Sequence, residues 1–288
     1  MSRAFELVYK VVVDCRNVRI DSQSINDVLR VASLNKVLLH FLRATGFKGE
    51  LRRREEARLK NVVKVVERIA HTFRNLDYAF FKLVKPAICT PSDLDILVAY
   101  SDVSSAFSRL RKLGFIAEVI EPYCITMVRG ASIVDLYLHP TLGGVIYLDA
   151  RKLLEHRRLA DFHGIEILTL ETYAEALVSI AHAVYKERIY TLNDYATVKG
   201  WLSKKTLRLA EELECQQAVS LAQRIHRGIE ERKHVLPYRI PLPLWVKALA
   251  LKIHCDKVAR STTFNLLRRL KDRRIGKHII SKLMRKTY

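Results

Sequence analysis

The sequence predicts an α+β fold, in which a small mixed β-sheet lies between helical segments. Short apolar runs rich in β-branched residues lie between residues 77 and 170, and they have the length of strands. Longer segments on both sides carry apolar residues at helical spacing. We therefore expect four parts: an N-terminal strand with helices (1–76), a sheet core (77–170), a helical region (171–236) and a basic helical C-terminal region (237–288).

The N-terminal part is expected to begin with a strand and to continue as two helices. Residues 5–13 alternate between apolar and other side chains, which predicts the strand. A helix capped by Ser22 or Ser24 then runs to Ala44 and ends at Gly46. The second helix covers residues 52–76. It begins with three arginines, which either face solvent or contact nucleic acid.

Two aspartates two residues apart mark the most informative stretch, from Ser92 to Val98. Successive side chains of a strand point to opposite faces, so Asp93 and Asp95 point the same way. Two anions on one face of a buried strand are costly unless a cation lies between them. The alternative is a strand end whose aspartates face water.

A third aspartate, Asp135, lies in another apolar run at residues 131–138. A helix predicted over residues 101–113 and further strands separate the two runs. Three carboxylates on neighbouring strands can hold two divalent ions, because Mg²⁺ prefers carboxylate and phosphate oxygens. Two such ions clamp the attacking and leaving oxygens of a phosphoryl-type transfer. His139 either contacts metal or substrate or faces solvent at the strand end.

The region after the third aspartate is predicted to turn and then to become helical. Gly143 and Gly144 predict a hairpin turn between the Asp135 strand and residues 145–148. Residues 171–230 have helical spacing throughout. Three tyrosines of this region either stack a base or pack with wet hydroxyl groups: Tyr185, Tyr190 and Tyr195.

The C-terminal part is predicted to be a basic helical region. Prolines at 237, 241 and 243 indicate a linker or boundary, and residues 244–259 predict a helix. Residues 261–263 are expected to cap a last helix with one apolar and one basic face, which suits RNA, DNA or an anionic membrane. Its predicted nucleic-acid-binding residues are Arg268, Arg269, Lys271, Arg273, Arg274 and Lys277.

Positive charge is concentrated near the C-terminus. The chain has 50 lysines and arginines against 30 aspartates and glutamates, a net charge of +20. Residues 232–288 hold sixteen of these cations and only two acids, Asp256 and Asp272. Such asymmetry indicates a polyanionic partner or an anionic surface.

The remaining composition favours a cytoplasmic location. Five dispersed cysteines without a Cys-x-x-Cys pair indicate reduced thiols rather than a disulfide framework or a zinc site. No apolar stretch approaches the length of about 18 residues that a membrane span needs, so none is expected. Residues 1–6 lack the layout of a signal peptide. The sequence does not fix the oligomeric state.

These motifs resemble the polymerase-beta-type nucleotidyltransferase superfamily, and most closely a prokaryotic branch of it. The run from Ser92 to Val98 resembles the DIDLLV strand of that branch, and residues 134–139 resemble its VDLH strand. The resemblance covers about residues 78–201. Further matches follow in the order of the family pattern: a strand at 164–170, then His182, Lys186 and Asp194.

The resemblance implies a nucleotidyltransferase that moves a nucleoside monophosphate from an NTP to a hydroxyl group, with two Mg²⁺ (or Mn²⁺) ions as cofactors. Asp93, Asp95 and Asp135 are the implied catalytic and metal-binding residues. RNA, conceivably tRNA, is the implied acceptor. Lys186 is the implied cation for the triphosphate, with a surface lysine as the alternative.

The sequence departs from the family before the paired aspartates. The family places a Gly-Gly or Gly-Ser pair there, so that backbone amides approach the nucleotide phosphates, whereas residues 82–92 contain no glycine. Donors and charge for the nucleotide are therefore expected from four other residues: Lys82, Lys85, Thr90 and Ser92. In the helical region, Asp194 either fixes a neighbouring cation, Lys186 or Arg188, or opens a helix.

Three functions are consistent with this sequence. The first is a metal-dependent nucleotidyltransferase acting on RNA. The second is a non-catalytic nucleic-acid-binding protein on a degenerate nucleotidyltransferase scaffold, which the missing glycines and the basic C-terminus favour. The third is a transferase acting on a small molecule or a partner protein, which leaves the basic region without a role.

Overall fold

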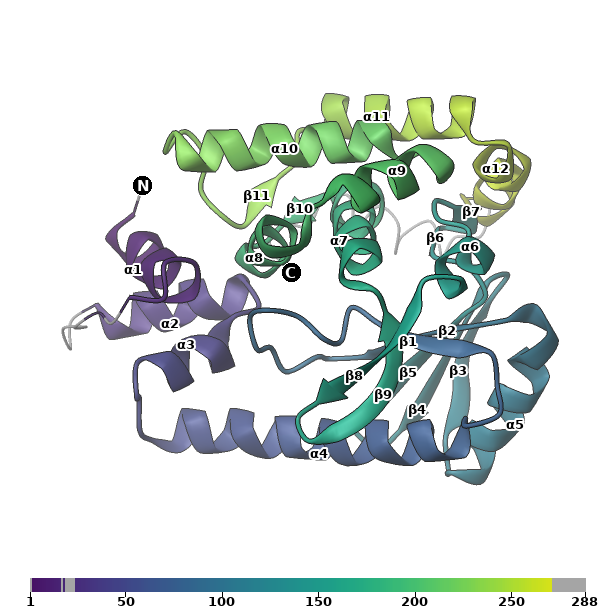
Figure 1. Cartoon of the computed structure of the whole chain (residues 1–288), viewed down its shortest axis with the longest axis horizontal. Helices are drawn as coiled ribbons and strands as arrows, with labels where there is room; N and C mark the ends of the chain where they lie inside the picture. Colours follow the sequence, from purple (N-terminus) through teal and green to yellow (C-terminus); the bar gives the residue numbers. More distant parts are fainter. Residues whose placement is uncertain (1, 17, 19–23, 271–288) are drawn as a thin grey trace.

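The computed structural model describes residues 2–16, 18 and 24–270. Within them, one mixed sheet has the strand order β3-β4-β5-β2-β1-β9-β8 (Figure 1). Strand β2 runs parallel to β5, and β1 runs parallel to β9, whereas the other neighbours are antiparallel. The strands are β1 (Tyr78–Phe81), β2 (Leu94–Val98), β3 (Ile116–Glu121), β4 (Cys124–Arg129), β5 (Ser132–Tyr137), β8 (Arg157–Phe162) and β9 (Ile165–Leu170).

Helices cover both faces of this sheet (Figure 1). One face packs against α4 (Glu50–Thr72) and α5 (Val103–Lys112). The other face lies toward a larger helical layer. That layer contains α1 (Arg3–Val12), α2 (Ile25–Leu34), α3 (Leu38–Ala44), α7 (Thr172–Ala181), the π-helical segment η2 (His182–Glu187), α8 (Leu192–Trp201), α9 (Lys204–Glu212), α10 (Gln216–Glu230), α11 (Leu242–Cys255) and α12 (Lys257–Leu270). Smaller elements are η1 (Tyr100–Asp102), α6 (Ala150–Leu154), and the two short ribbons β6 (Thr141–Leu142) with β7 (Val145–Ile146) and β10 (Ile189–Tyr190) with β11 (Tyr238–Arg239).

The alternation of side chains along β2 sets which face carries the aspartates. Leu94 and Ile96 belong to the core between the sheet and α4, whereas Leu97 belongs to the core under the larger helical layer. Asp95 therefore points toward the larger layer, in keeping with the period of two in a strand. The sheet thus presents its carboxylates where the helical region can reach them.

Two N-terminal predictions are wrong. Residues 5–13 are not a strand, because α1 buries residues at helical spacing (Phe5, Val8, Val11 and Val12) and the Ser2 hydroxyl caps it. The helix expected to run to Ala44 is broken at Asn35 and Lys36, where Lys36 has a φ of 57°. The helix expected at 52–76 is confirmed as α4.

Gly143 and Gly144 form the predicted turn, but it joins two short strands that are not part of the main sheet. Gly143 and Gly144 have φ values of 57° and 89° and join β6 to β7. This ribbon is separate from the main sheet, so the turn does not extend the Asp135 strand.

The C-terminal helices also differ from the prediction. The expected cap at residues 261–263 is wrong, because α12 begins earlier, where the Asp256 carboxylate accepts the Val258 N–H at 2.7 Å. Thr262 lies inside α12 and accepts the Ile146 N–H at 3.1 Å. The proline-rich segment contains β11, which pairs with β10, so it is tied to the helical layer.

Most of the predicted nucleic-acid-binding residues lie outside the described part of the chain. Arg268 is exposed on α12. Arg269 lies on the same helix, and its side chain is not among those described, while Lys271, Arg273, Arg274 and Lys277 fall beyond residue 270. Among the helices that the structure describes, none is long and apolar enough to cross a bilayer.

Candidate metal and nucleotide site

Strand pairing brings the three aspartates together. Asp95 of β2 is the register partner of Asp135 on the parallel strand β5, and of Phe81 on β1. Asp93 lies one residue before β2 and two before Asp95. One carboxylate oxygen from each aspartate lies within 4.8 Å of the others. This group, Asp93, Asp95 and Asp135, is called the aspartate triad below.

Hydroxyl groups orient two members of the triad. The Ser92 hydroxyl donates to Asp93 Oδ1 at 2.7 Å, and the Thr126 hydroxyl donates to Asp135 Oδ1 at 2.6 Å. Asp95 is only 7% exposed, and its Oδ1 has no hydrogen-bond partner among the described residues. A buried carboxylate oxygen without a partner is costly unless a cation reaches it. The donor set, all carboxylate oxygen, suits Mg²⁺ or Mn²⁺.

Within the described part of the chain, Lys82 is the cation that forms an ion pair with Asp95. Its Nζ lies 2.8 Å from Asp95 Oδ2. The residue directly follows β1 and has a φ of 61°, a conformation that favours glycine. Its backbone N–H donates to both oxygens of Glu175, at 3.0 Å each. Lys82 therefore adopts a glycine-type conformation in the segment where the family places its glycines.

The site shifts the protonation of its acidic and basic groups. Burial raises the pKa of Asp95 to about 6; Lys82 opposes that shift and the charge of Asp93 adds to it. Burial also acts on Asp93, but Lys82 and the Ser92 hydroxyl hold the pKa of Asp93 below its ordinary value. Burial opposes the charged form of Lys82, yet the neighbouring aspartates raise its pKa. An ammonium ion thus faces at least one carboxylate at neutral pH.

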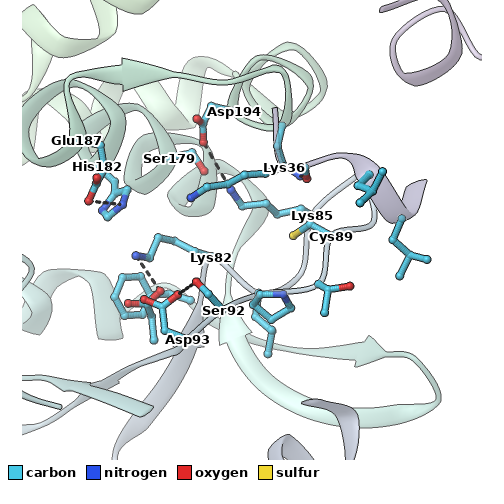
Figure 2. A pocket seen from close by; sticks show the side chains of 18 of the residues that line it. Lys36, Lys82, Lys85, Cys89, Ser92, Asp93, Ser179, His182, Glu187 and Asp194 are labelled. Carbon is cyan, nitrogen blue, oxygen red and sulfur yellow. Dashed lines mark hydrogen bonds and ion pairs between the residues drawn. The ribbon is translucent and has the colours of Figure 1, made fainter. Parts of the chain in front are cut away.

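A cavity of about 530 Å³ opens over the triad and contains several lysines (Figure 2). Lys186 Nζ donates to the Tyr137 hydroxyl at 2.9 Å. Lys85 Nζ lies 3.7 Å from Asp194 Oδ1, and Lys36 extends beside it (Figure 2). Four ammonium groups beside a carboxylate site give the charge that a metal-bound triphosphate requires. They are Lys36, Lys82, Lys85 and Lys186.

All the residues predicted for metal and nucleotide binding line this cavity. Besides the triad, they are Lys82, Lys85, Thr90, Ser92 and Lys186. The Thr90 hydroxyl is buried and has no partner among the described residues. Asp194 opens α8 through a capping box with Thr191, and the cation beside it is Lys85 rather than Lys186 or Arg188.

Other candidates lie away from the cavity. His139 accepts the Ala150 N–H at the start of α6, and burial lowers its pKa, so its role there is structural. The three tyrosines of the helical region are fully buried in the core, and none lines this cavity: Tyr185, Tyr190 and Tyr195. They therefore pack rather than stack an incoming base.

Lys36 also lines the cavity, although no pattern in the sequence indicated it. Its turn is held by side chains distant in sequence: Asn193 Nδ2 donates to the Lys36 carbonyl at 3.1 Å. Asn35 Oδ1 accepts the Leu192 N–H at 2.9 Å, and Asn35 Nδ2 donates to the Leu236 carbonyl at 3.0 Å. Burial lowers the pKa of Lys36, while Asp194 opposes that shift. These contacts tie the N-terminal section to the site.

Segment η2 carries two further cavity residues, His182 and Glu187. His182 Nδ1 lies 3.3 Å from the Tyr147 hydroxyl, and its Nε2 lies 3.6 Å from Glu187 Oε1. Burial and the surrounding lysines hold the pKa of His182 well below its ordinary value, so the ring is neutral. π-helical turns recur at functional sites, so the position of His182 and Glu187 beside Lys186 is consistent with a binding role.

Comparison with solved structures finds nucleotidyltransferases. A crystal structure of ANT(2'')-Ia in complex with adenylyl-2''-tobramycin is 13% identical, covers 59% of this chain and 99% of that chain, and gives a TM-score of 0.36. A solution structure of the antibiotic-resistance factor ANT(2'')-Ia is 11% identical, covers 60% and 94%, and gives 0.33. Both similarities are too distant to assign an activity or a substrate to this chain. No protein-family model and no curated protein sequence matches it.

Proposed function

We propose that this protein is a metal-dependent nucleotidyltransferase, which moves a nucleoside monophosphate from an NTP to a hydroxyl acceptor. One observation carries the proposal. The three carboxylates of the aspartate triad converge within 4.8 Å in a lysine-lined cavity, with a buried oxygen on Asp95 that has no partner among the described residues. Carboxylates paired with cations that suit phosphate are the requirements of phosphoryl-type transfer.

Each group then has a role in the transfer. Asp93, Asp95 and Asp135 would hold two Mg²⁺ or Mn²⁺ ions, which neutralise phosphate charge and lower the pKa of the acceptor hydroxyl. The lysines of the cavity bind and orient the triphosphate. The acceptor oxygen forms a bond to the α-phosphorus, and the bond from that phosphorus to the β-bridging oxygen breaks. Pyrophosphate leaves with the electron pair, and Asp135 accepts the hydroxyl proton.

RNA is the acceptor that we propose, with tRNA as one possible form. The net charge of +20 and the sixteen lysines and arginines after residue 231 support a polyanionic partner. Such charge serves no purpose for a small neutral acceptor.

Label transfer from α-labelled NTP to RNA tests this function. Each NTP is incubated with total cellular RNA and Mg²⁺ or Mn²⁺, and the RNA is separated on a gel. Asp93→Ala and Asp135→Ala should abolish labelling, because each removes a ligand of the triad. Glu118→Gln, an exposed carboxylate change on β3, is the matched control and should keep it. Equal labelling in both aspartate variants refutes the assignment, and label in a small molecule instead of RNA refutes the acceptor.

The Lys82–Asp95 ion pair favours a second candidate, a nucleic-acid-binding protein on a degenerate scaffold. Lys82 already neutralises the most buried aspartate of the triad. The site therefore tolerates the absence of a metal ion better than three bare carboxylates would. RNA binding without label transfer under either metal would select this candidate.

A further inference from the structure

A second cavity, of about 410 Å³, adjoins the triad cavity. One wall is α4, and the other is the turn between β4 and β5 at residues 129–133. Residues 90–93 line both cavities, and so does Arg58. The space is therefore continuous from this second cavity to Asp93. It is called the basic groove, and its polar lining residues outside that shared loop are Arg58, Asn61, Lys64, Arg68, Arg129 and Ser132.

The groove carries four cations, and Asp93 is the one carboxylate among its described lining residues. Arg58 pairs with Glu55 at 2.6 Å. Arg129 is fixed, because it donates to the Leu113 carbonyl at 2.8 Å and its guanidinium lies 5.1 Å from the centre of the Phe115 ring. The groove is thus positive along its length and negative only where it meets the triad.

Lys64 and Arg68 are available to a ligand. Both side chains are exposed on α4, and neither has an ion-pair partner in the described part of the chain. Free cations on a protein surface that faces a groove are the usual contacts of phosphates. Their charge is not needed to compensate a neighbouring carboxylate.

The spacing of these residues along α4 follows one face of the helix. Asn61, Lys64 and Arg68 are three and four residues apart, which places them on the same side. From Arg58 to Arg68 the helix rises about 15 Å, at 1.5 Å per residue. That length is greater than a single phosphate group can span, and it is sufficient for several successive phosphates of a nucleic-acid strand. Two apolar lining residues that are not fully buried, Val62 and Ile133, can contact sugars and bases.

We propose that the basic groove binds the backbone of a single-stranded nucleic acid, with the chain end directed to the aspartate triad. Phosphates contact Lys64, Arg68 and Arg129, and the terminal hydroxyl passes Ser92 and Asp93. The role of that hydroxyl as acceptor rests on the proposed function. Strand binding itself does not, because it depends only on the groove.

Binding of a labelled single-stranded oligonucleotide, in chelator and without NTP, tests the groove. The double variant Lys64→Glu/Arg68→Glu should bind at least about tenfold more weakly, and its log–log salt slope should fall by about 2. Arg111→Glu/Lys112→Glu, a double charge reversal at exposed positions of α5, is the matched control and should keep both values. The neutral Lys64→Gln/Arg68→Gln variant repeats the test if charge reversal disturbs folding, which thermal unfolding reports. Unchanged affinity in the variants, or an equal loss in the control, overturns the proposal.

The direction of the strand is tested by crosslinking. An oligonucleotide with a photoreactive 3′-terminal nucleotide should crosslink to residues 90–93, and crosslinks confined to α12 would overturn the proposed path. RNA and DNA versions of the same oligonucleotide identify the preferred backbone. Label transfer measured in parallel keeps the two proposals separate. If the groove variants lose binding but no label is transferred, the proposed function is refuted and the groove proposal stands. If label is transferred but the groove variants bind as before, only the groove proposal is refuted.

Discussion

Lys82 holds a backbone conformation that costs a non-glycine residue about 1–2 kcal/mol. The hydrogen bond from its N–H to Glu175 and its ion pair with Asp95 offset this cost. The same ammonium lies where it competes with a divalent ion for Asp95 and attracts a nucleotide phosphate. Lys82 therefore links metal binding at the triad to nucleotide binding.

This coupling predicts opposite effects of one substitution. Lys82→Met should tighten Mn²⁺ binding without nucleotide, because the competing cation is gone, and should weaken NTP binding, because a phosphate contact is lost. Isothermal titration measures both affinities. Lys85→Met removes a lysine whose partner is Asp194, so it should leave Mn²⁺ affinity unchanged. Equal Mn²⁺ affinity in Lys82→Met and the unmodified protein would contradict the competition.

Glu175 gives a prediction about pH. Burial raises the pKa of this carboxyl from 4.5 to about 7, and the Lys82 N–H opposes the shift. The folded state then binds a proton that the unfolded state has lost, so stability falls as pH rises from about 4.5 to 7. Glu175→Gln should lose less stability than the unmodified protein between pH 5 and 8, by up to about 3 kcal/mol. Urea unfolding at both pH values measures this, and an identical loss in both proteins would contradict it.

At this scale the sequence predicted the triad but not its surroundings. The aspartates follow from the strand period of two, which is local. Lys36 reaches the cavity, and Glu175 reaches the backbone of Lys82, only through tertiary contacts between segments more than ninety residues apart. No local pattern encodes such contacts.

The turn between α2 and α3 shows how an element serves the site. Its Asn35 is fully buried, and the side chain makes three hydrogen bonds, to Val31, Leu192 and Leu236. Two of these groups lie about 160 and 200 positions away along the chain. The turn interrupts what the apolar spacing predicted as one helix, and Lys36 projects from it.

Asn35→Ala should therefore affect stability and binding together. It leaves the Leu192 N–H and the Leu236 carbonyl without partners, which should lower the free energy of unfolding by about 2–4 kcal/mol. NTP affinity should fall as well, because Lys36 loses its fixed position. Asn75→Ala, at an exposed position after α4, is the control for both measurements. A stability loss in Asn35→Ala with unchanged NTP affinity would exclude Lys36 from the nucleotide site.

Helices and strands were predicted correctly where the apolar residues that repeat along the sequence are the ones that pack in the core. Helix α4 has a long amphipathic pattern, and its buried stripe (Leu59, Val66, Ile69) forms the core under the sheet. The prediction of a strand at residues 5–13 was wrong because valines occur in both strands and helices. The helix places Phe5 and Val8 together in the core.

At the scale of the molecule, the α+β class and the mixed sheet were predictable, but the integration of the C-terminal part was not. Trp245 of α11 donates to the Tyr185 carbonyl at 3.1 Å. Lys252 is buried, and its Nζ lies 2.7 Å from Asp256. Helix α12 packs on β7 through Thr262. These contacts make α11 and α12 part of the folded unit rather than a detachable basic tail.

Two truncations should therefore behave differently. Removing residues 271–288 leaves α11 and α12 in place, and it should weaken RNA binding and lower its salt slope. Removing residues 237–288 exposes the core under α11 and should abolish cooperative unfolding. Calorimetry and oligonucleotide binding distinguish them. Unaltered RNA affinity after the shorter truncation would show that the last eighteen residues make no contribution to binding.

The central claim is that the aspartate triad holds a divalent ion. Electron paramagnetic resonance of free Mn²⁺, titrated with protein in the presence of NTP, measures that binding directly. The account predicts that the unmodified protein and Glu118→Gln remove Mn²⁺ from solution and that Asp95→Asn does not, since it replaces the most buried carboxylate of the triad. Equal depletion of free Mn²⁺ by Asp95→Asn, or no depletion by the unmodified protein, would contradict it.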